Sequence, residues 1–347
     1  MKEKVDILKN VDWDNLTFSI TPTRSMYLAY CENNEGWKAG QLEPYGDITI
    51  SPSAGVLNYG QGVFEGLKAF HSVKNRIVLF RPDRNASRMH ESAIRLCIPP
   101  VPEKMFMDAV IAVVHDNVDF VPQQKKGSLY IRPCIWGSGP VLGVKPAPSY
   151  TFIIYVSPVG PYFPGGLKCL SLKVTNLYHR AAPKGLGNVK AIGNYSAALY
   201  PHKLAKKHGF DEVIYVNAAN ENFIEEVGSA NLFVLKDSCL KTPRLGGSIL
   251  PGVTRDSVIQ IAGEILGLEV QETDVTINDV LNADELFCSG TAAVITPIGK
   301  VSTDDESREI GGNRIGSLTR EIYDILTGIQ NESREDPFAW VQPVMGL

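Results

Sequence analysis

The first half of the chain alternates between runs typical of β-strands and stretches with the period of an amphipathic helix. Strands are expected where β-branched and aromatic residues gather, at residues 76–80, 128–136 and 150–156. One helix is expected after Asp83, which can cap it, with an apolar stripe that includes Met89 and Ala93. A second helix is expected over residues 106–118.

The second half repeats this alternation. Strands are expected at residues 169–174, 212–216, 223–227, 231–235 and 285–288. Helices are expected at residues 196–208 and 315–326, and where one face carries Val258, Ile261, Ala262, Ile265 and Leu266. The whole pattern predicts a mixed α+β (α/β) fold.

A loop rich in proline and glycine separates the two halves. Residues 157–166 read SPVGPYFPGG, and such a run continues neither a helix nor a strand. The chain has 347 residues, which is longer than an ordinary domain of about 100–200 residues. We therefore predict a smaller N-terminal domain at 1–157, an interdomain loop at 158–166 and a larger C-terminal domain at 167–347 that carries Lys190.

Charge and composition exclude several classes of protein. The net charge is −4 with both signs mixed along the chain, so no basic block points to nucleic acid. The apolar run at 109–114 is too short to span a membrane, and the N-terminus lacks the apolar core of a secretory signal. The six cysteines are scattered and the six histidines lack metal-ligand spacing. We expect a cytoplasmic protein with reduced thiols, no metal site, and no nucleic-acid or membrane partner.

Residues 60–66 (GQGVFEG) resemble a dinucleotide-binding glycine motif without matching it. The motif needs glycines at relative positions 1, 3 and 6. Position 6 is Glu65, and the glycine comes one residue later. The chain also has no G-x-x-x-x-G-K-[ST] loop and no G-x-S-x-G elbow, which argues against nucleotide-binding and serine-hydrolase folds.

Lys190 lies in a setting suited to chemistry. The segment 185–195 (GLGNVKAIGNY) places apolar residues beside this lysine and glycines on both sides, which lets a bulky group approach closely. An amine desolvated among apolar neighbours loses its proton more easily and becomes a nucleophile for carbonyl groups. The local context alone still favours an ordinary solvated lysine.

Two short turns are candidate phosphate sites. Gly252, Val253 and Thr254 lead into a predicted helix, whose N–H groups can hold a phosphate. An ordinary capped turn explains the same residues. Thr291 follows the strand at 285–288 in the same way, with the same alternative.

Two sets of charged side chains also have alternative explanations. Arg84, Arg88 and Arg95 share one helix face, which is either solvated or directs one arginine to an anion. Glu225 and Glu226 are adjacent in a predicted strand, so they point to opposite faces. Either one of them is buried with a partner, or both are exposed to solvent on an edge strand.

Seven segments together resemble the branched-chain aminotransferase family, within the fold-type IV pyridoxal-phosphate enzymes. The resemblance extends from about residue 13 to residue 340. The segments are LNYGQGVFEGLKAF at 57–70, GSLYIRP at 127–133, YVSPVGPYF at 155–163, GLGNVKAIGNY at 185–195, EEVGSANLFV at 225–234, ILPGVTR at 249–255 and FCSGTAAVITP at 287–297. The resemblance implies a barrel-like sheet in the larger domain, pyridoxal 5′-phosphate as the cofactor, and a homodimer.

The resemblance also implies a role for each matching residue. Lys190 matches the lysine that binds the cofactor aldehyde, Tyr195 the tyrosine beside the cofactor phenolate, and Glu226 the acid that pairs with the pyridine nitrogen. The phosphate cradle is matched by Arg88, Val253, Thr254 and Thr291, and the turn that meets the substrate α-carboxylate by Thr291 and Ala292. The substrate side-chain pocket is matched by Phe64, Tyr130 and Arg132, and the residue contributed across the dimer interface by Tyr59.

The reaction implied is amino-group transfer between leucine, isoleucine or valine and 2-oxoglutarate by a ping-pong mechanism. Within the same fold, the alternatives are an aminotransferase for D-amino acids, (R)-amines or a methionine-related 2-oxo acid, or a lyase. A cofactor-binding protein without turnover is a third possibility, which the presence of both Lys190 and Glu226 argues against. Lys184 and Leu186 depart from the family, which has glycine and a small residue or threonine before the lysine.

Overall fold

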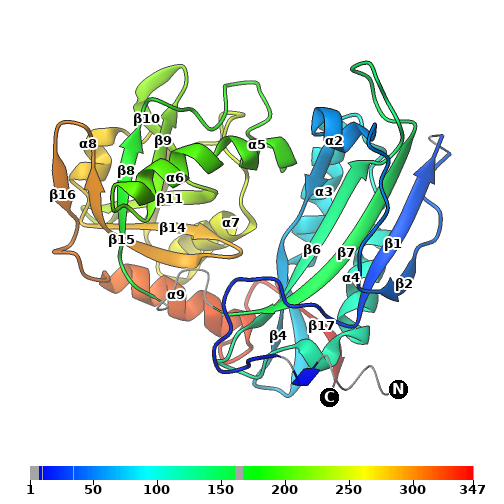
Figure 1. Cartoon of the computed structure of the whole chain (residues 1–347). Helices are drawn as coiled ribbons and strands as arrows, with labels where there is room; N and C mark the ends of the chain where they lie inside the picture. The colour runs from blue at the N-terminus through cyan, green and yellow to red at the C-terminus, as the bar shows by residue number, and fades with distance from the viewer. Residues whose placement is uncertain (1–7, 10, 34, 161–166, 347) are drawn as a thin grey trace. The chain divides into compact units, whose positions relative to one another are not determined.

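The chain folds into two compact units. The computed structural model describes residues 8–9, 11–33, 35–160 and 167–346 (Figure 1). The first unit comprises Met1–Pro164, Val189–Gly193 and Gly328–Leu347, and the second comprises Gly165–Asn188 and Asn194–Thr327. The short stretch that holds Lys190 thus packs as part of the first unit. Residues 161–166 of the predicted interdomain loop lie outside the described residues, and the predicted domain limits stay a prediction.

The first unit is built on an eight-stranded antiparallel sheet. Its strand order is β17-β5-β4-β6-β7-β1-β2, and β3 pairs with β6. The strands are β1 (Ser25–Glu32), β2 (Gln41–Pro44), β3 (Gly62–Phe64), β4 (Leu67–His71), β5 (Arg76–Phe80), β6 (Ser128–Gly137), β7 (Ser149–Val159) and β17 (Val341–Gly346). The expected strands at 76–80, 128–136 and 150–156 are therefore confirmed.

Helices α3 (Pro82–Arg95) and α4 (Glu103–Asp116) share one apolar core with this sheet. Both helices were expected from the sequence. Along β6, Leu129, Ile131 and Ile135 enter that core, because successive side chains of a strand point to opposite faces. Tyr130 and Arg132 consequently lie on the other face. Among the described residues, this unit also contains the helical segments α2 (Gly55–Tyr59) and η1 (Val118–Phe120), which is a single turn.

The second unit contains a closed six-stranded barrel-like sheet. The path β10-β9-β8-β15-β14-β11 closes through the additional pairing of β10 with β11. These strands are β8 (Leu170–Thr175), β9 (Glu212–Asn217), β10 (Asn220–Val227), β11 (Ala230–Lys236), β14 (Glu285–Gly290) and β15 (Val294–Ser302). Strands β12 (Cys239–Pro243) and β13 (Glu269–Thr273) extend the sheet from β11, and β16 (Ser307–Glu309) pairs with β15. The barrel implied by the family resemblance is confirmed.

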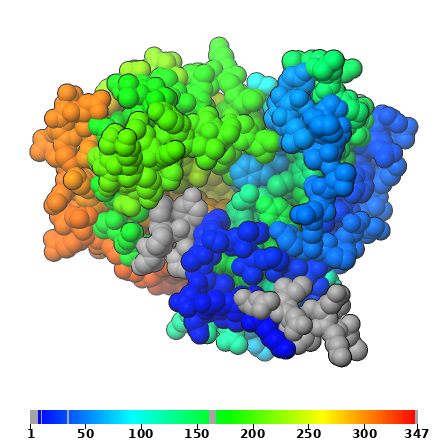
Figure 2. All heavy atoms as spheres, in the orientation of Figure 1, coloured from blue at the N-terminus to red at the C-terminus, as the bar shows by residue number. Residues whose placement is uncertain are grey.

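Helices follow or connect the strands of the barrel along the chain. They are α5 (Ile192–Ala197), α6 (Leu199–Lys207), α7 (Val253–Gln260) with a following π-helical turn η2 (Ile261–Ile265), α8 (Ile277–Leu281) and α9 (Ser317–Gln330). The expected helix at 196–208 is in fact two helices that break at Ala198. Helix α6 packs on β9 through Ala205, Val213 and Tyr215, and Figure 2 shows it in green on the surface of this unit. In the described part of the chain, no helix is both long and apolar enough to cross a membrane.

Candidate active site

The twelve predicted site residues fall into two sets. Six belong to the first unit: Tyr59, Phe64, Arg88, Tyr130, Arg132 and Lys190. Six belong to the second: Tyr195, Glu226, Val253, Thr254, Thr291 and Ala292.

Lys190 is held at both of its backbone groups. Its carbonyl oxygen accepts a hydrogen bond from the Phe64 N–H at 3.1 Å, and its own N–H donates to Ser92 Oγ at 3.1 Å. The neighbouring Ala191 forms an isolated β-bridge with Val63. The lysine thus lies along β3 as a fixed, half-buried residue rather than on a solvated surface. Its ammonium nitrogen lies 4.9 Å from the centre of the Phe64 ring.

Lys184 shows how the chain accommodates its departure from the family. This residue is exposed and has φ of 63°, in the left-handed region that glycine adopts without strain. The glycine expected at this position is therefore replaced by a lysine in a glycine-like backbone conformation.

Arg88 lies against a carboxylate. Its Nε donates to Glu65 Oε1 at 2.7 Å and its Nη2 donates to Glu65 Oε2 at 2.9 Å. Asn85 Nδ2 donates to the same Oε2 at 2.8 Å. The sequence predicted that the arginine face of α3 is either solvated or directs one arginine to an anion. Arg88 does contact an anion, which is the carboxylate of Glu65.

Phe64, Tyr130 and Arg132 form one cluster on the sheet face opposite the helices. The Arg132 guanidinium lies 4.8 Å from the centre of the Phe64 ring and 5.2 Å from that of Tyr130. Its Nη2 donates to the Tyr130 hydroxyl at 3.3 Å. Burial alone would lower the pKa of Arg132, but the adjacent Tyr130 raises it above the ordinary value, so this guanidinium stays charged.

Lys68 lies beside this cluster. It is directly opposite Tyr130 in the pairing of β4 with β6, and it is buried. Burial lowers the pKa of its ammonium to about 8. No pattern in the sequence pointed to this lysine, because its burial depends on the pairing of β4 with β6.

Tyr59 lies at the end of α2, and 42% of its surface is exposed. Its hydroxyl donates to the carbonyl oxygen of Leu142. Leu142 and Val144 are 92% and 87% exposed, and Leu57 is 59% exposed. An exposed apolar group of this kind is typical of an interaction surface.

In the second unit, Glu226 is buried and paired. Its Oε2 lies 2.6 Å from Arg180 Nε, and its Oε1 accepts from Asn231 Nδ2 at 3.0 Å. Arg180 and Tyr195 line the same small cavity of about 20 Å³ as Glu226. The sequence analysis missed Arg180 and Asn231, because each becomes a partner of Glu226 only when separate strands and loops meet.

Glu225 is buried as well, with 1% of its surface exposed. Its Oε1 accepts from Asn217 Nδ2 at 2.9 Å and from the Ser248 hydroxyl. The alternative in which both glutamates are exposed to solvent on an edge strand is therefore wrong. The reason is that β10 is paired on both sides within the closed barrel.

The two predicted phosphate turns differ in their detail. Val253 and Thr254 open α7, and no described side chain caps this helix, so its first N–H groups are not engaged by a cap. Gly252 packs so closely that an added Cβ would lie 2.1 Å from Asn231 Oδ1, the residue that also contacts Glu226. Thr291 follows Ser289, whose buried hydroxyl has no hydrogen-bond partner among the described residues.

These features match a known family. A family model for class IV amino-transferases aligns with residues 62–301, which contain Lys190, Glu226 and both turns. The chain belongs to the class IV amino-transferases. The predicted family is thereby confirmed.

Several curated relatives of this class IV amino-transferase are plant proteins. A chloroplastic branched-chain-amino-acid aminotransferase of Arabidopsis thaliana is 44% identical over 96% of this chain and 80% of its own length. A chloroplastic branched-chain amino acid aminotransferase of Humulus lupulus is 46% identical over 96% and 81%. A methionine aminotransferase of Arabidopsis thaliana is 40% identical over 95% and 93%.

Solved structures agree with the fold-type IV architecture. The Escherichia coli branched-chain amino acid aminotransferase has a TM-score of 0.80 and 32% identity, covering 93% of this chain and all of its own. The T.th. branched-chain amino acid aminotransferase has a TM-score of 0.78 and 26% identity over 93% of this chain and 99% of its own. That structure holds N-(5′-phosphopyridoxyl)-L-glutamate, and a second structure of the same protein holds pyridoxamine 5′-phosphate.

The expectation of a cytoplasmic protein is contradicted. Two of the relatives described above are named as chloroplastic, and another Humulus lupulus relative, 42% identical, is named as mitochondrial. The absence of a recognisable signal near residue 1 was therefore no guide to location.

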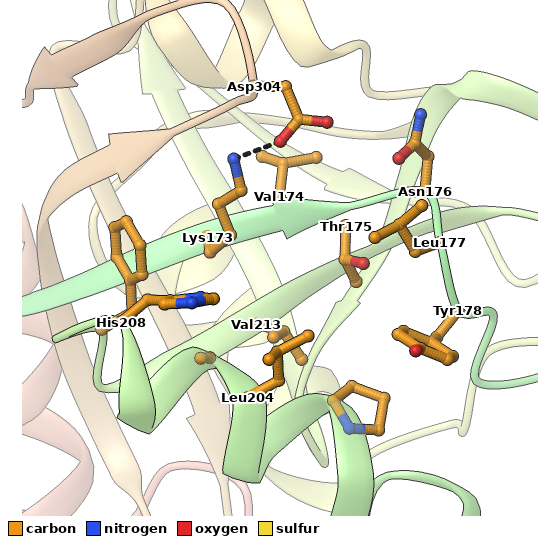
Figure 3. A pocket seen from close by; sticks show the side chains of 13 residues that line it. Lys173, Val174, Thr175, Asn176, Leu177, Tyr178, Leu204, His208, Val213 and Asp304 are labelled. Atoms are coloured by element: carbon orange, nitrogen blue, oxygen red, sulfur yellow. Dashed lines mark hydrogen bonds and ion pairs between the residues drawn. The ribbon is translucent and has the colours of Figure 1, made fainter.

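A larger cavity in the second unit contains none of the predicted site residues. It has a volume of about 290 Å³ and lies between β8 and α6 (Figure 3). Its lining includes Val174, Leu204 and Val213, and an ion pair of 2.5 Å joins Lys173 to Asp304 at its edge. Size alone therefore does not identify the candidate active site in this unit.

Proposed function

We propose that this chain transfers amino groups between L-leucine, L-isoleucine or L-valine and 2-oxoglutarate, with pyridoxal 5′-phosphate as its cofactor and as a homodimer. The observation that carries the proposal is the position of the Phe64 ring. Its centre lies 4.9 Å from the Lys190 ammonium and 4.8 Å from the Arg132 guanidinium. An amine and a permanent cation that both lie close to one apolar ring can serve substrates with an apolar side chain and, in turn, a distal carboxylate.

The second unit supplies groups that fit the cofactor. The buried Ser289 hydroxyl has no partner among the described residues, and the start of α7 is uncapped by any described side chain. A buried hydroxyl and the N–H groups at a helix start can donate hydrogen bonds to phosphate oxygens. The phosphate would be held by Val253, Thr254 and Thr291. The buried Glu226, with Tyr195 beside it, suits the ring nitrogen and the phenolate oxygen of pyridoxal phosphate. The ligands named for the two T.th. structures support this assignment.

Each of the proposed site residues would have a separate role in the reaction. When bound, pyridoxal phosphate supplies an electron sink and a carrier for the amino group. Glu226, which is paired with Arg180, would hold a proton at the ring nitrogen. Lys190 Nζ would move a proton to and from the substrate carbon. The two hydrogen bonds of the Lys190 backbone hold the main chain from which this side chain extends. Arg132 and Tyr130 orient the distal carboxylate of glutamate.

The homodimer is supported by the exposed apolar group around Tyr59. Leu57, Leu142 and Val144 are each more than half exposed, which is costly in water. We propose that a second copy of the chain covers them and that Tyr59 acts at the partner's site.

A methionine-related 2-oxo acid is the second candidate substrate, because a methionine aminotransferase is 40% identical to this chain. One experiment separates the candidates. The absorbance spectrum of the purified protein is followed while leucine, isoleucine, valine, methionine and glutamate are added in turn. We expect conversion with the branched-chain amino acids and with glutamate. A response to methionine that greatly exceeds the response to leucine would favour the second candidate.

Attachment of the cofactor is tested by borohydride reduction and peptide mapping. The label is expected on Lys190, and Lys68 is the control because its burial lowers the pKa of its ammonium and so favours a reactive neutral amine. A label on Lys68 would contradict the assignment. A colourless protein that takes up no pyridoxal phosphate would overturn the proposed function as a whole.

A further inference from the structure

Glu65 is a fully buried carboxylate with several donors. It is 0% exposed, and its oxygens accept from Arg88 Nε, Arg88 Nη2 and Asn85 Nδ2. The backbone N–H of Gly66 donates to Oε2 at 3.1 Å. A carboxylate is placed in a dry interior only when such partners compensate for lost hydration.

The charge state of Glu65 follows from these contacts. Burial alone would raise its pKa, but Arg88, the electrostatic attraction of Lys190 and the bond from Asn85 together hold the pKa below the ordinary value. Glu65 is therefore ionised at neutral pH. It forms a negative centre in the first unit to which both Arg88 and Lys190 are attracted.

The two bonds from Arg88 fix the plane of its guanidinium. A guanidinium has five N–H donors in a rigid fork, and Glu65 engages one on Nε and one on Nη2. These two bonds therefore set the direction in which the other edges of the guanidinium face. Side chains pre-oriented in this way bind an anion without first losing rotational freedom.

We propose that Glu65 is a positioning residue for the cofactor phosphate, acting through Arg88. The inference rests on the proposed function and on the expectation, drawn from the family resemblance, that Arg88 belongs to the phosphate cradle. Glu65 does not touch the phosphate, because two anions repel each other. Glu65 determines which edge of the Arg88 guanidinium faces the phosphate. The residue that breaks the dinucleotide motif at position 6 is thus the anchor of a different phosphate site.

The test compares two ligands that differ only in the phosphate. The apoprotein is titrated with pyridoxamine 5′-phosphate and with pyridoxamine, neither of which reacts with Lys190, and the preference for the phosphorylated ligand is expressed as the ratio of the two affinities. In Glu65→Gln, the charge that orients Arg88 is lost. We expect binding of pyridoxamine 5′-phosphate to weaken by about tenfold to a hundredfold, with pyridoxamine little changed. Arg88→Lys, which keeps the charge but not the fork, is expected to reduce the ratio to a similar extent.

The matched control is Glu332→Gln. Glu332 is also a glutamate of the first unit that pairs with an arginine, Arg76, and its side chain is only 6% exposed. Its substitution should lower the melting temperature but leave the ratio of affinities as in the wild type. If Glu65→Gln fails to fold, Asn85→Ala removes one donor to Glu65 and is expected to lower the ratio by a smaller factor.

The outcomes distinguish a failure of the proposed function from a failure of the role of Glu65. If the wild-type protein binds neither ligand, the proposed function fails. If it prefers pyridoxamine 5′-phosphate and Glu65→Gln keeps that preference while Arg88→Lys loses it, Arg88 is oriented without Glu65 and the inference alone is wrong. An equal loss for both ligands in Glu65→Gln would also overturn it, because the residue would then serve only the fold.

Discussion

The Arg180 Nε atom lies 2.6 Å from a carboxylate oxygen of Glu226, and both side chains are almost completely buried. Asn231 donates to the other oxygen of the same carboxylate. The Arg180 guanidinium also donates to the carbonyl oxygen of Ser248, whose hydroxyl donates to Glu225. The two adjacent glutamates therefore belong to one polar network, although they point to opposite faces of β10.

This network predicts that Glu226→Gln and Glu225→Gln fail in different ways. A neutral amide at 226 cannot hold the proton at the cofactor ring nitrogen, so kcat should fall by about a hundredfold or more. A neutral amide at 225 disturbs the bonds to Asn217 and Ser248, which should cost about 1–3 kcal/mol of unfolding free energy and leave kcat of the folded protein close to wild type. Steady-state kinetics and urea unfolding of both variants measure the two effects. Equal losses of kcat would show that Glu226 has no special role.

Arg132→Met should separate the two substrates of the ping-pong reaction. Methionine keeps an apolar contact with Phe64 but removes the cation and the bond to Tyr130. A charge-assisted contact is worth roughly 1.5–3 kcal/mol, so the KM for 2-oxoglutarate should rise by about tenfold to a hundredfold while that for leucine changes little. Leucine serves as the internal control. A parallel rise for both substrates would make Arg132 a structural residue.

Complementation between inactive subunits tests the dimer. We expect Lys190→Ala and Tyr59→Ala each to be inactive alone, because one lacks the reactive amine and the other lacks the residue proposed to act at the partner's site. In a mixed dimer one of the two sites has both residues intact, so mixing the variants should restore activity. Mass measurement under native conditions confirms that mixed dimers form. No rescue in their presence would place Tyr59 at its own subunit's site or outside any site.

Acid should weaken the first unit through Glu332. Hydrogen bonds from Arg76 lower the pKa of this carboxyl from 4.5 to about 2. Because the folded pKa is depressed, the stabilisation is fully present above pH 4.5 and is lost as the pH falls toward about 2. Arg76 is 34% exposed, so solvent screening reduces the effect to about 1–2 kcal/mol.

The measurement is the urea midpoint of wild type and Glu332→Gln between pH 7 and pH 2. The difference between the two proteins should be largest at neutral pH and should shrink below pH 4.5. A difference that stays constant down to about pH 2 would show that ionisation of Glu332 does not contribute.

Local sequence determined the elements whose patterns are strong by themselves. The β-branched and aromatic residues of 128–136 predicted β6, and a strand there places Tyr130 and Arg132 on one face, because side chains of a strand alternate. The helix after Asp83 and the helix near 106–118 followed from apolar stripes of helical period. The order of seven motifs was enough to identify the family, since each motif carries its own local chemistry.

Tertiary structure alone decided which charges are paired. Glu65 meets Arg88 from 23 residues away, and Glu226 meets Arg180 from another part of the second unit. No periodicity encodes such contacts, because they depend on how strands and helices pack after they form. The same is true of Glu225, which is buried because the barrel closes through β10 and β11. The sequence by itself determined the types of secondary-structure element, the family and the candidate residues. The packing of those elements decided which of the charged side chains are buried and which partners hold them.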